Sequence, residues 1–408
     1  MNLTKARRRL LLIAANSLNS LLLPLVSIAV SLLVVRLASV ELWGAFVSVM
    51  IVVQLGAHVI GWGNQEYLLR QFSRAPTRLG RAWQTSLLTR LLLLPLFMAV
   101  IILLGWPAQQ VLLATVWTIG LVLAQSFSVL VVFRRAFLAA IAVELAATGA
   151  ILVIVLLQGA ALTVASLLLL FAVTSLARAL ALGLVFRRDI SQPQAPASTA
   201  EPRWRIDLRY FKLAMPFFLL GLSGLLQSRI DLYSVSYFLS KQEVGQYQVF
   251  LSLLLYLQAT ANFILQPYVK SIYRLDETII WKIALRLFGL GWLLIAPAML
   301  AVTWVLATLY GFNPPPSFIV LGGLYVLPIF FDLPIIYALY KADRTATVIS
   351  VNLTGFMFNL LLNIWLLPRV GLVGAILAST VVHWGVFAFY LSQGLRMRTS
   401  RWRLGQAT

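Results

Sequence analysis

Six charged residues lie inside long apolar stretches of the sequence: Arg90, Glu144, Arg178, Arg229, Asp231 and Asp332. A charged side chain within a membrane costs about 2.5–3.5 kcal/mol even on insertion scales, so each must pair, reach the membrane surface or face water. An arginine that faces water can hold an anion through its guanidinium fork, whereas a carboxylate can carry a proton or a cation.

Arg229 lies deep in its stretch, about 14 Å from the nearer end at about 1.5 Å per residue, so its side chain cannot easily reach the surface. Asp231 lies two positions further on, and on a helix it faces another way. Gln227 shares a helix face with Asp231, and Tyr233 shares one with Arg229. We predict that Arg229, Gln227 and Tyr233 contact an anionic substrate and that Asp231 takes part in ion coupling.

Glu144 and Arg178 fall at similar depth in consecutive helices, which favours a structural ion pair. Arg178 is also a candidate for the substrate site, on the chemistry of its guanidinium alone. Arg90 could extend its side chain to the cytoplasmic surface, and pairing or contact with water are the alternatives.

Asp332 lies between Pro328 and Pro334, which are expected to break its helix. We predict that its carboxylate takes part in ion coupling. The alternative is that it only caps a kink in the helix. His383 titrates in the range suited to proton transfer, although it could equally be a packing residue. Asn16 and Ser20 belong to a polar stripe of the first stretch, which predicts a substrate path or, alternatively, helix packing through small residues.

The amino-acid composition indicates an integral membrane protein. Apolar residues make up 61% of the 408 residues and charged residues 11%, against about 45–50% and about 25% in soluble domains. The net charge of +20 comes from basic residues in short loops, so it indicates membrane topology and not nucleic acid. With no cysteine and two distant histidines, the sequence predicts no metal and no cofactor.

Twelve stretches are long and apolar enough to span a membrane as helices. They cover residues 10–35, 43–62, 84–105, 111–132, 138–158, 162–185, 212–238, 246–267, 285–308, 318–340, 347–367 and 372–394. Alternate connections are rich in Lys and Arg, while the others carry only Arg36, Lys241 and Arg369. This bias predicts a multi-pass protein of the bacterial inner membrane with both termini in the cytoplasm.

A Pro- and Ala-rich segment divides the chain into two six-helix lobes. We predict an N-terminal lobe over 1–186, a cytoplasmic linker over 187–211, and a C-terminal lobe with a cytoplasmic tail over 212–408. Residues 40–46 resemble residues 243–250, which indicates a parallel internal repeat around a central cleft. The fold class is therefore all-α and polytopic. No P-loop sequence is present to hydrolyse ATP.

Three stretches carry a resemblance to a known family: residues 37–44 with 66–70, residues 229–231 with 244–247, and Asn363, Pro368 and 371–375. On these the chain resembles the polysaccharide-biosynthesis and O-antigen repeat-unit flippases (Wzx-like) of the multidrug/oligosaccharidyl-lipid/polysaccharide exporter superfamily. The usual aromatic residue after Gly44 is absent, since Ala45 follows. Of the family's cavity arginines, only Arg229 with Asp231 has motif support.

The resemblance implies a flippase and no enzyme. Its substrate would be an undecaprenyl-diphosphate-linked oligosaccharide, moved to the periplasmic leaflet by alternating access for surface-polysaccharide assembly. The implied partners are this lipid, the phospholipid bilayer, H+ or Na+, and a glycan polymerase with its chain-length machinery. A multidrug/cation antiporter of the same superfamily is the alternative, followed by a membrane glycosyltransferase or polymerase, and by a scaffold of the assembly complex.

Overall fold

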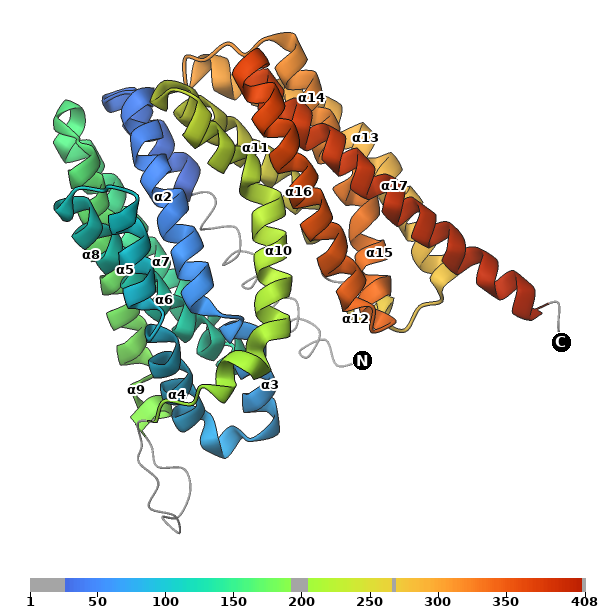
Figure 1. Ribbon diagram of the computed structural model, residues 1–408, viewed down its shortest axis with the longest axis horizontal. Helices are drawn as coiled ribbons and strands as arrows, with labels where there is room; N and C mark the ends of the chain where they lie inside the picture. Colours follow the sequence, from blue (N-terminus) through green and yellow to red (C-terminus); the bar gives the residue numbers. More distant parts are fainter. Residues whose placement is uncertain (1–25, 192–204, 266–268, 406–408) are drawn as a thin grey trace, which may run out of the picture. The chain divides into compact units, whose positions relative to one another are not determined.

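The computed structural model describes residues 26–191, 205–265 and 269–405, and its secondary structure there is helical without strands (Figure 1). Eleven of its helices are long and apolar enough to cross a membrane. The first predicted span appears only as the helix Val26–Leu37, because residues 10–25 lie outside the described part of the chain. The predicted all-α polytopic fold is confirmed.

The chain forms two compact units, Met1–Leu222 and Ser223–Thr408. In the N-terminal unit the helices after Val26–Leu37 are α2 Val40–Gly61, α3 Asn64–Arg74, the 3-10 turn η1 Pro76–Arg78, α4 Leu79–Leu91, α5 Leu94–Leu103, α6 Ala108–Arg134, α7 Phe137–Gln158, the 3-10 turn η2 Gly159–Ala161, α8 Val164–Val185 and α9 Arg187–Ser191.

The next helix, α10 Arg209–Phe238, contributes its first half to the N-terminal unit and its second half to the C-terminal unit. The division thus falls inside α10, at Leu222, and the linker predicted over 187–211 is helical at both of its described ends. The helices that follow are α11 Lys241–Leu265, α12 Val269–Ile272, α13 Glu277–Thr308, α14 Pro316–Val326, α15 Ile329–Lys341, α16 Thr345–Val370 and α17 Leu372–Gly405.

Three of the membrane spans are broken near their middle. The span Val40–Arg74 breaks between α2 and α3, where Trp62 and Gly63 have φ of 41° and 64°. The span Pro76–Leu103 breaks between α4 and α5, just before Pro95, and the span Pro316–Lys341 breaks at Pro328. Positive φ ends a regular helix and proline removes a backbone donor, so these breaks leave polar backbone groups without a partner in their own helix.

The break after α2 is held by the first half of α10. A Cβ on Gly63 would lie 2.6 Å from the backbone nitrogen of Phe218, so only glycine permits this approach. The indole nitrogen of Trp62 donates to the Phe211 carbonyl at 2.9 Å, and its ring stacks on Phe218 at 3.9 Å. The broken backbone is therefore fixed in place, not frayed.

The two segments that indicated a repeat begin their helices in the same way. Ser39 accepts from the Leu42 N–H at 3.0 Å at the start of α2, and Ser240 exchanges hydrogen bonds with Glu243 at the start of α11. A serine N-cap satisfies otherwise unpaired N–H groups of the first turn. Gly44 and Gly245, each five residues after its serine, are both buried.

Candidate functional site

Arg229 lies in the middle of α10, in the part that belongs to the C-terminal unit. It is half-buried and has no hydrogen bond or ion pair with any residue that the structure describes. Its charge interacts electrostatically with Asp231, Tyr233 and Tyr325. The sequence argument that Arg229 and Asp231 do not pair is thus confirmed, and the guanidinium keeps its donors available for a ligand.

Asp231 is 2% exposed, and its carboxylate is held by donors from three helices. It accepts from the Tyr247 hydroxyl of α11 at 2.7 Å, from Ser379 Oγ of α17 at 3.1 Å and from the Leu232 N–H at 2.7 Å. Hydrogen bonds of this number stabilise a charged carboxylate away from water. The sequence predicted the buried carboxylate but not its partners.

Ser379 extends this arrangement to α16. Asn359 Nδ2 donates to Ser379 Oγ at 3.2 Å, and Asn363 Nδ2 donates to Asn359 Oδ1 at 2.6 Å. The Oδ1 atom of Asn363 is buried and has no hydrogen-bond partner among the described residues. We refer to Asp231, Tyr247, Asn359, Asn363 and Ser379 as the polar cluster. Its oxygen atoms form a set of ligands suited to a proton or a monovalent cation.

Two further candidates lie close to this cluster. His383 Nδ1 is 2.9 Å from the Ser379 carbonyl, and its ring packs on Tyr325 with centroids 4.3 Å apart. Gln227 lies beside α16, where a Cβ on Gly355 would come 3.2 Å from Gln227 Nε2. The structure thus brings His383 and Asp231 to the same serine, one through its backbone and the other through its side chain.

Asp332 forms a separate site in the C-terminal unit. It is 4% exposed on α15, and its Oδ1 has no hydrogen-bond partner among the described residues. The Tyr390 hydroxyl of α17 is likewise buried without a partner, and the two groups interact electrostatically. A carboxyl group in this setting strongly prefers a proton or a bound cation to a bare charge.

In the N-terminal unit, the structure excludes the expectation that the Arg90 side chain reaches the cytoplasmic surface. The side chain is 0% exposed. The guanidinium donates to Ser126 Oγ at 2.7 Å, to the Ser86 carbonyl at 3.2 Å and to the Gly61 carbonyl at 3.4 Å. Arg90 can stay buried because the span Val40–Arg74 is broken after α2. The last turn of α2 then offers the Gly61 carbonyl as an acceptor, whereas an unbroken helix would use that carbonyl itself.

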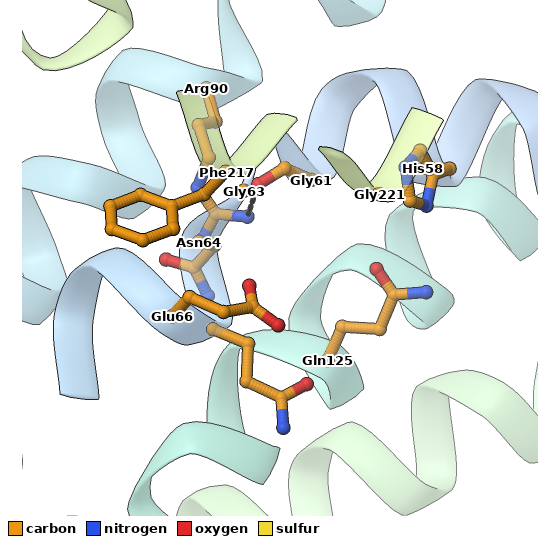
Figure 2. A pocket seen from close by; sticks show the side chains of 10 residues that line it. His58, Gly61, Gly63, Asn64, Glu66, Arg90, Gln125, Phe217 and Gly221 are labelled. Carbon is orange, nitrogen blue, oxygen red and sulfur yellow. Dashed lines mark hydrogen bonds between the residues drawn. The ribbon is translucent and has the colours of Figure 1, made fainter. Parts of the chain in front are cut away.

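A cavity of about 240 Å³ adjoins Arg90. Figure 2 shows the side chains of Arg90 and Glu66 at this cavity, with the hydrogen bond from Arg90 to Gly61 as a dashed line. His58 Nε2 and Asn64 Nδ2 also line it and are buried without hydrogen-bond partners in the described structure. Unsatisfied polar atoms around a space of this size indicate bound water or a polar ligand.

Replacing Arg90 with lysine is expected to lower the thermal stability of the purified protein. Lysine keeps the charge but cannot donate to Ser126 and Gly61 from one planar group, and a lost buried hydrogen bond costs about 1–3 kcal/mol. Thermal unfolding in detergent measures the effect, with the exposed Arg70→Lys on α3 as control. An unchanged midpoint in Arg90→Lys contradicts the structural role.

Arg178 and Glu144 form the ion pair that the sequence indicated, with Arg178 Nη1 3.3 Å from Glu144 Oε2 between α8 and α7. Their side chains are 15% and 13% exposed. The guanidinium is already engaged, so we do not carry Arg178 into the substrate site. Tyr233 lies near Arg229 as expected, whereas Asn16 and Ser20 are outside the described residues.

The Glu144→Gln variant is expected to be less stable than the double variant Glu144→Gln/Arg178→Gln. Removing one partner leaves a buried charge without compensation, at a cost of roughly 3–5 kcal/mol in buried pairs. Removing both leaves two neutral amides that can bond to each other. Thermal unfolding of the three proteins in detergent measures this order. Equal stability of the single and double variants means that the pair contributes nothing.

No protein-family model matches the chain, and no curated protein is similar to it in sequence. Several solved transporters have a similar fold. The lipid II flippase MurJ in an inward closed conformation superposes with a TM-score of 0.62 at 12% identity, over 94% of this chain and 87% of that one. An inward-facing multidrug resistance transporter of the MATE family and MOP superfamily gives a TM-score of 0.56 at 13% identity, over 92% of this chain and 95% of that one.

A third structure is a MOP superfamily transporter from Pyrococcus furiosus, described as having a binding pocket of reverse polarity. It gives a TM-score of 0.53 at 13% identity, over 95% of this chain and 94% of that one. At these identities the likeness shows the fold. The chain is a multi-pass membrane protein with the fold of MATE and MurJ transporters, and the similar structures are transporters and not enzymes.

Proposed function

We propose that this chain is a flippase for an undecaprenyl-diphosphate-linked oligosaccharide, moved from the cytoplasmic to the periplasmic leaflet of the bacterial inner membrane. The observation that carries the proposal is Arg229, a cation in the middle of a membrane helix without an ion pair or hydrogen bond to any described residue. The nearest carboxylate in sequence, Asp231, is engaged by Tyr247 and Ser379 instead.

A cation in this position is costly, at about 2.5–3.5 kcal/mol on insertion scales. A substrate that carries phosphate offsets that cost, because a guanidinium binds phosphate oxygens through two parallel hydrogen bonds. A cationic drug would instead be repelled by Arg229. The diphosphate lipid is therefore the substrate class that best fits this residue, with Tyr233 and Gln227 as neighbouring polar groups.

The proposed energy source is an H+ or Na+ gradient coupled at the polar cluster. Asp231 supplies the negative charge, and the buried, unpartnered Asn363 Oδ1 supplies an acceptor that a proton or cation can use. The cluster joins α10, α11, α16 and α17, so occupancy of Asp231 would alter the packing of four spans. This is the kind of element through which ion binding can bias two conformations.

A multidrug/cation antiporter is the second candidate, and Asp332 is the observation that favours it. Its carboxyl group is buried with a free oxygen near the unpartnered Tyr390 hydroxyl, which suits exchange of a proton for a cation. Under this alternative, Asp332 would be essential and Arg229 would not.

Expression in two bacterial hosts separates the candidates. The flippase predicts that the chain restores surface polysaccharide in a strain that lacks its own repeat-unit flippase. It also predicts no added drug resistance in a strain without drug exporters. Drug resistance without restored polysaccharide would establish the antiporter instead. Partnership with a glycan polymerase and its chain-length machinery belongs to the same proposal and is tested by co-purification.

A further inference from the structure

A second cavity in the N-terminal unit, of about 420 Å³, is lined by three arginines. Arg74 comes from the last turn of α3, Arg78 from η1, and Arg81 from the first turn of α4. Asp207, just before α10, and Tyr210, in its first turn, also line the cavity. The distribution of Lys and Arg in the sequence predicts that this end of the unit faces the cytoplasm.

The arginines converge because of how the chain turns between its second and third spans. Helix α3 continues from α2 as far as Arg74, the chain reverses at Pro76, and α4 returns alongside. Arginines that would repel one another along an extended loop are thus held around one space. Such an arrangement raises the local positive potential and costs energy unless an anion occupies it.

Asp207 is the one carboxylate among the described residues that line this cavity, against three arginines, and it forms no ion pair with Arg74 or Arg78. Asp207 Oδ1 accepts from the Arg209 N–H at 3.1 Å at the start of α10, and the Asp207 N–H donates to Thr89 Oγ1 at 3.0 Å. Arg74 and Arg78 are exposed and have no hydrogen bond or ion pair with any described residue. Asp207 therefore orders the start of α10, and the guanidinium groups of Arg74 and Arg78 remain available to an anion.

Arg90 adds a buried positive charge behind the cavity. Ser86, which is 1% exposed, lines the cavity, and its Oγ accepts from Arg90 Nε at 3.3 Å while donating to Asn64 Oδ1 at 2.9 Å. No carboxylate of the described residues lies within ion-pair distance of Arg90. Because a charge in a poorly hydrated interior is weakly screened, Arg90 acts on an anion held beyond Ser86.

We propose that this cavity, which we call the arginine pocket, binds phosphate groups on the cytoplasmic side of the membrane. The ligand chemistry is that of a phosphate ester or diphosphate, because several guanidinium groups around one space suit an anion with several equivalent oxygens. The source is either the headgroup of an anionic lipid or free pyrophosphate. The arginine pocket is separate from the transport activity proposed above. The proposal for the pocket therefore does not depend on which substrate the chain moves.

Binding to the purified full chain in detergent tests the proposal. The probes are inorganic pyrophosphate, measured by calorimetry, and phosphatidylglycerol, measured as bound adducts by native mass spectrometry with phosphatidylcholine as the neutral comparison. The test variant is Arg74→Gln/Arg78→Gln. The matched control is Arg187→Gln/Arg188→Gln, which removes two exposed charges from α9 outside the pocket. Thermal unfolding verifies that all proteins are folded.

We expect the test variant to bind at least about tenfold more weakly than the wild type, and the control to bind like the wild type. Loss confined to phosphatidylglycerol supports the pocket and identifies a lipid headgroup as the source, whereas loss for both probes supports a site that accepts free phosphate as well. If the test variant binds both probes as the wild type does, or if the control loses as much, the arginine pocket is not a phosphate site.

Discussion

The Arg229→Ala variant is expected to abolish restoration of surface polysaccharide in a flippase-deficient strain while the protein is still made and inserted. The reason is that Arg229 has no structural partner among the described residues, so its removal breaks no hydrogen bond of the fold. Two charge-assisted hydrogen bonds to a diphosphate, at about 1.5–3 kcal/mol each, correspond to transport at least about a hundredfold slower.

A lysine variant at position 229 distinguishes the contribution of the positive charge to transport from that of the two parallel guanidinium hydrogen bonds. Arg229→Lys keeps the positive charge but loses the bidentate fork, so we expect partial activity between the wild type and Arg229→Ala. The control is Arg369→Ala, which removes an exposed arginine of the same unit whose guanidinium donates to the Trp365 carbonyl and lies over the Trp365 ring. Normal polysaccharide in Arg229→Ala would remove the basis for an anionic substrate.

Asp231→Asn is expected to slow gradient-driven transport strongly. The amide that replaces one carboxylate oxygen is a donor, and Tyr247 and Ser379 both donate to Oδ2, so at least one hydrogen bond is lost. The variant also lacks the negative charge that an ion or proton would neutralise. We expect transport at least about tenfold slower, with substrate binding retained, because Arg229 makes no ion pair with Asp231 that the variant would break.

Asp332→Asn is the companion variant for this experiment. If the polar cluster couples transport, Asp332→Asn keeps most of its activity, since its carboxyl group makes no hydrogen bond that the structure describes. Initial rates with and without an imposed H+ or Na+ gradient measure the effect in proteoliposomes. Should Asp332→Asn lose the gradient response and Asp231→Asn keep it, coupling belongs to Asp332.

The sequence predicted the fold because the membrane imposes it. Each span must satisfy its own backbone hydrogen bonds, so long apolar stretches identify helices without reference to their neighbours. The twelve predicted stretches correspond to eleven long helices and the short helix Val26–Leu37 in the described part of the chain. The breaks within spans were harder to predict. The local signal for them is the residue type, because glycine, here Gly63 with its positive φ, and proline, here Pro95, commonly interrupt a helix.

Single charges could be predicted, but their partners could not. Asp231 was visible as a carboxylate in an apolar stretch, whereas Tyr247 and Ser379 lie 16 and 148 positions away and are residue types common in membrane helices. For the same reason the sequence left open whether Arg90 reaches the surface, and the structure shows that it is buried. Whether its side chain reaches the surface depends on the Gly61 carbonyl, Ser126 and Ser86, which only the folded unit brings around it.

Reconstitution into liposomes with a fluorescent undecaprenyl-diphosphate oligosaccharide tests the central claim most directly. The fraction of label accessible to a membrane-impermeant quencher reports movement between leaflets. The account predicts that the wild-type chain moves the label, that Arg229→Ala does not, and that a sugar lipid without the diphosphate is not moved. Equal movement by the wild type and Arg229→Ala, or movement of the lipid without diphosphate at the same rate, would contradict it.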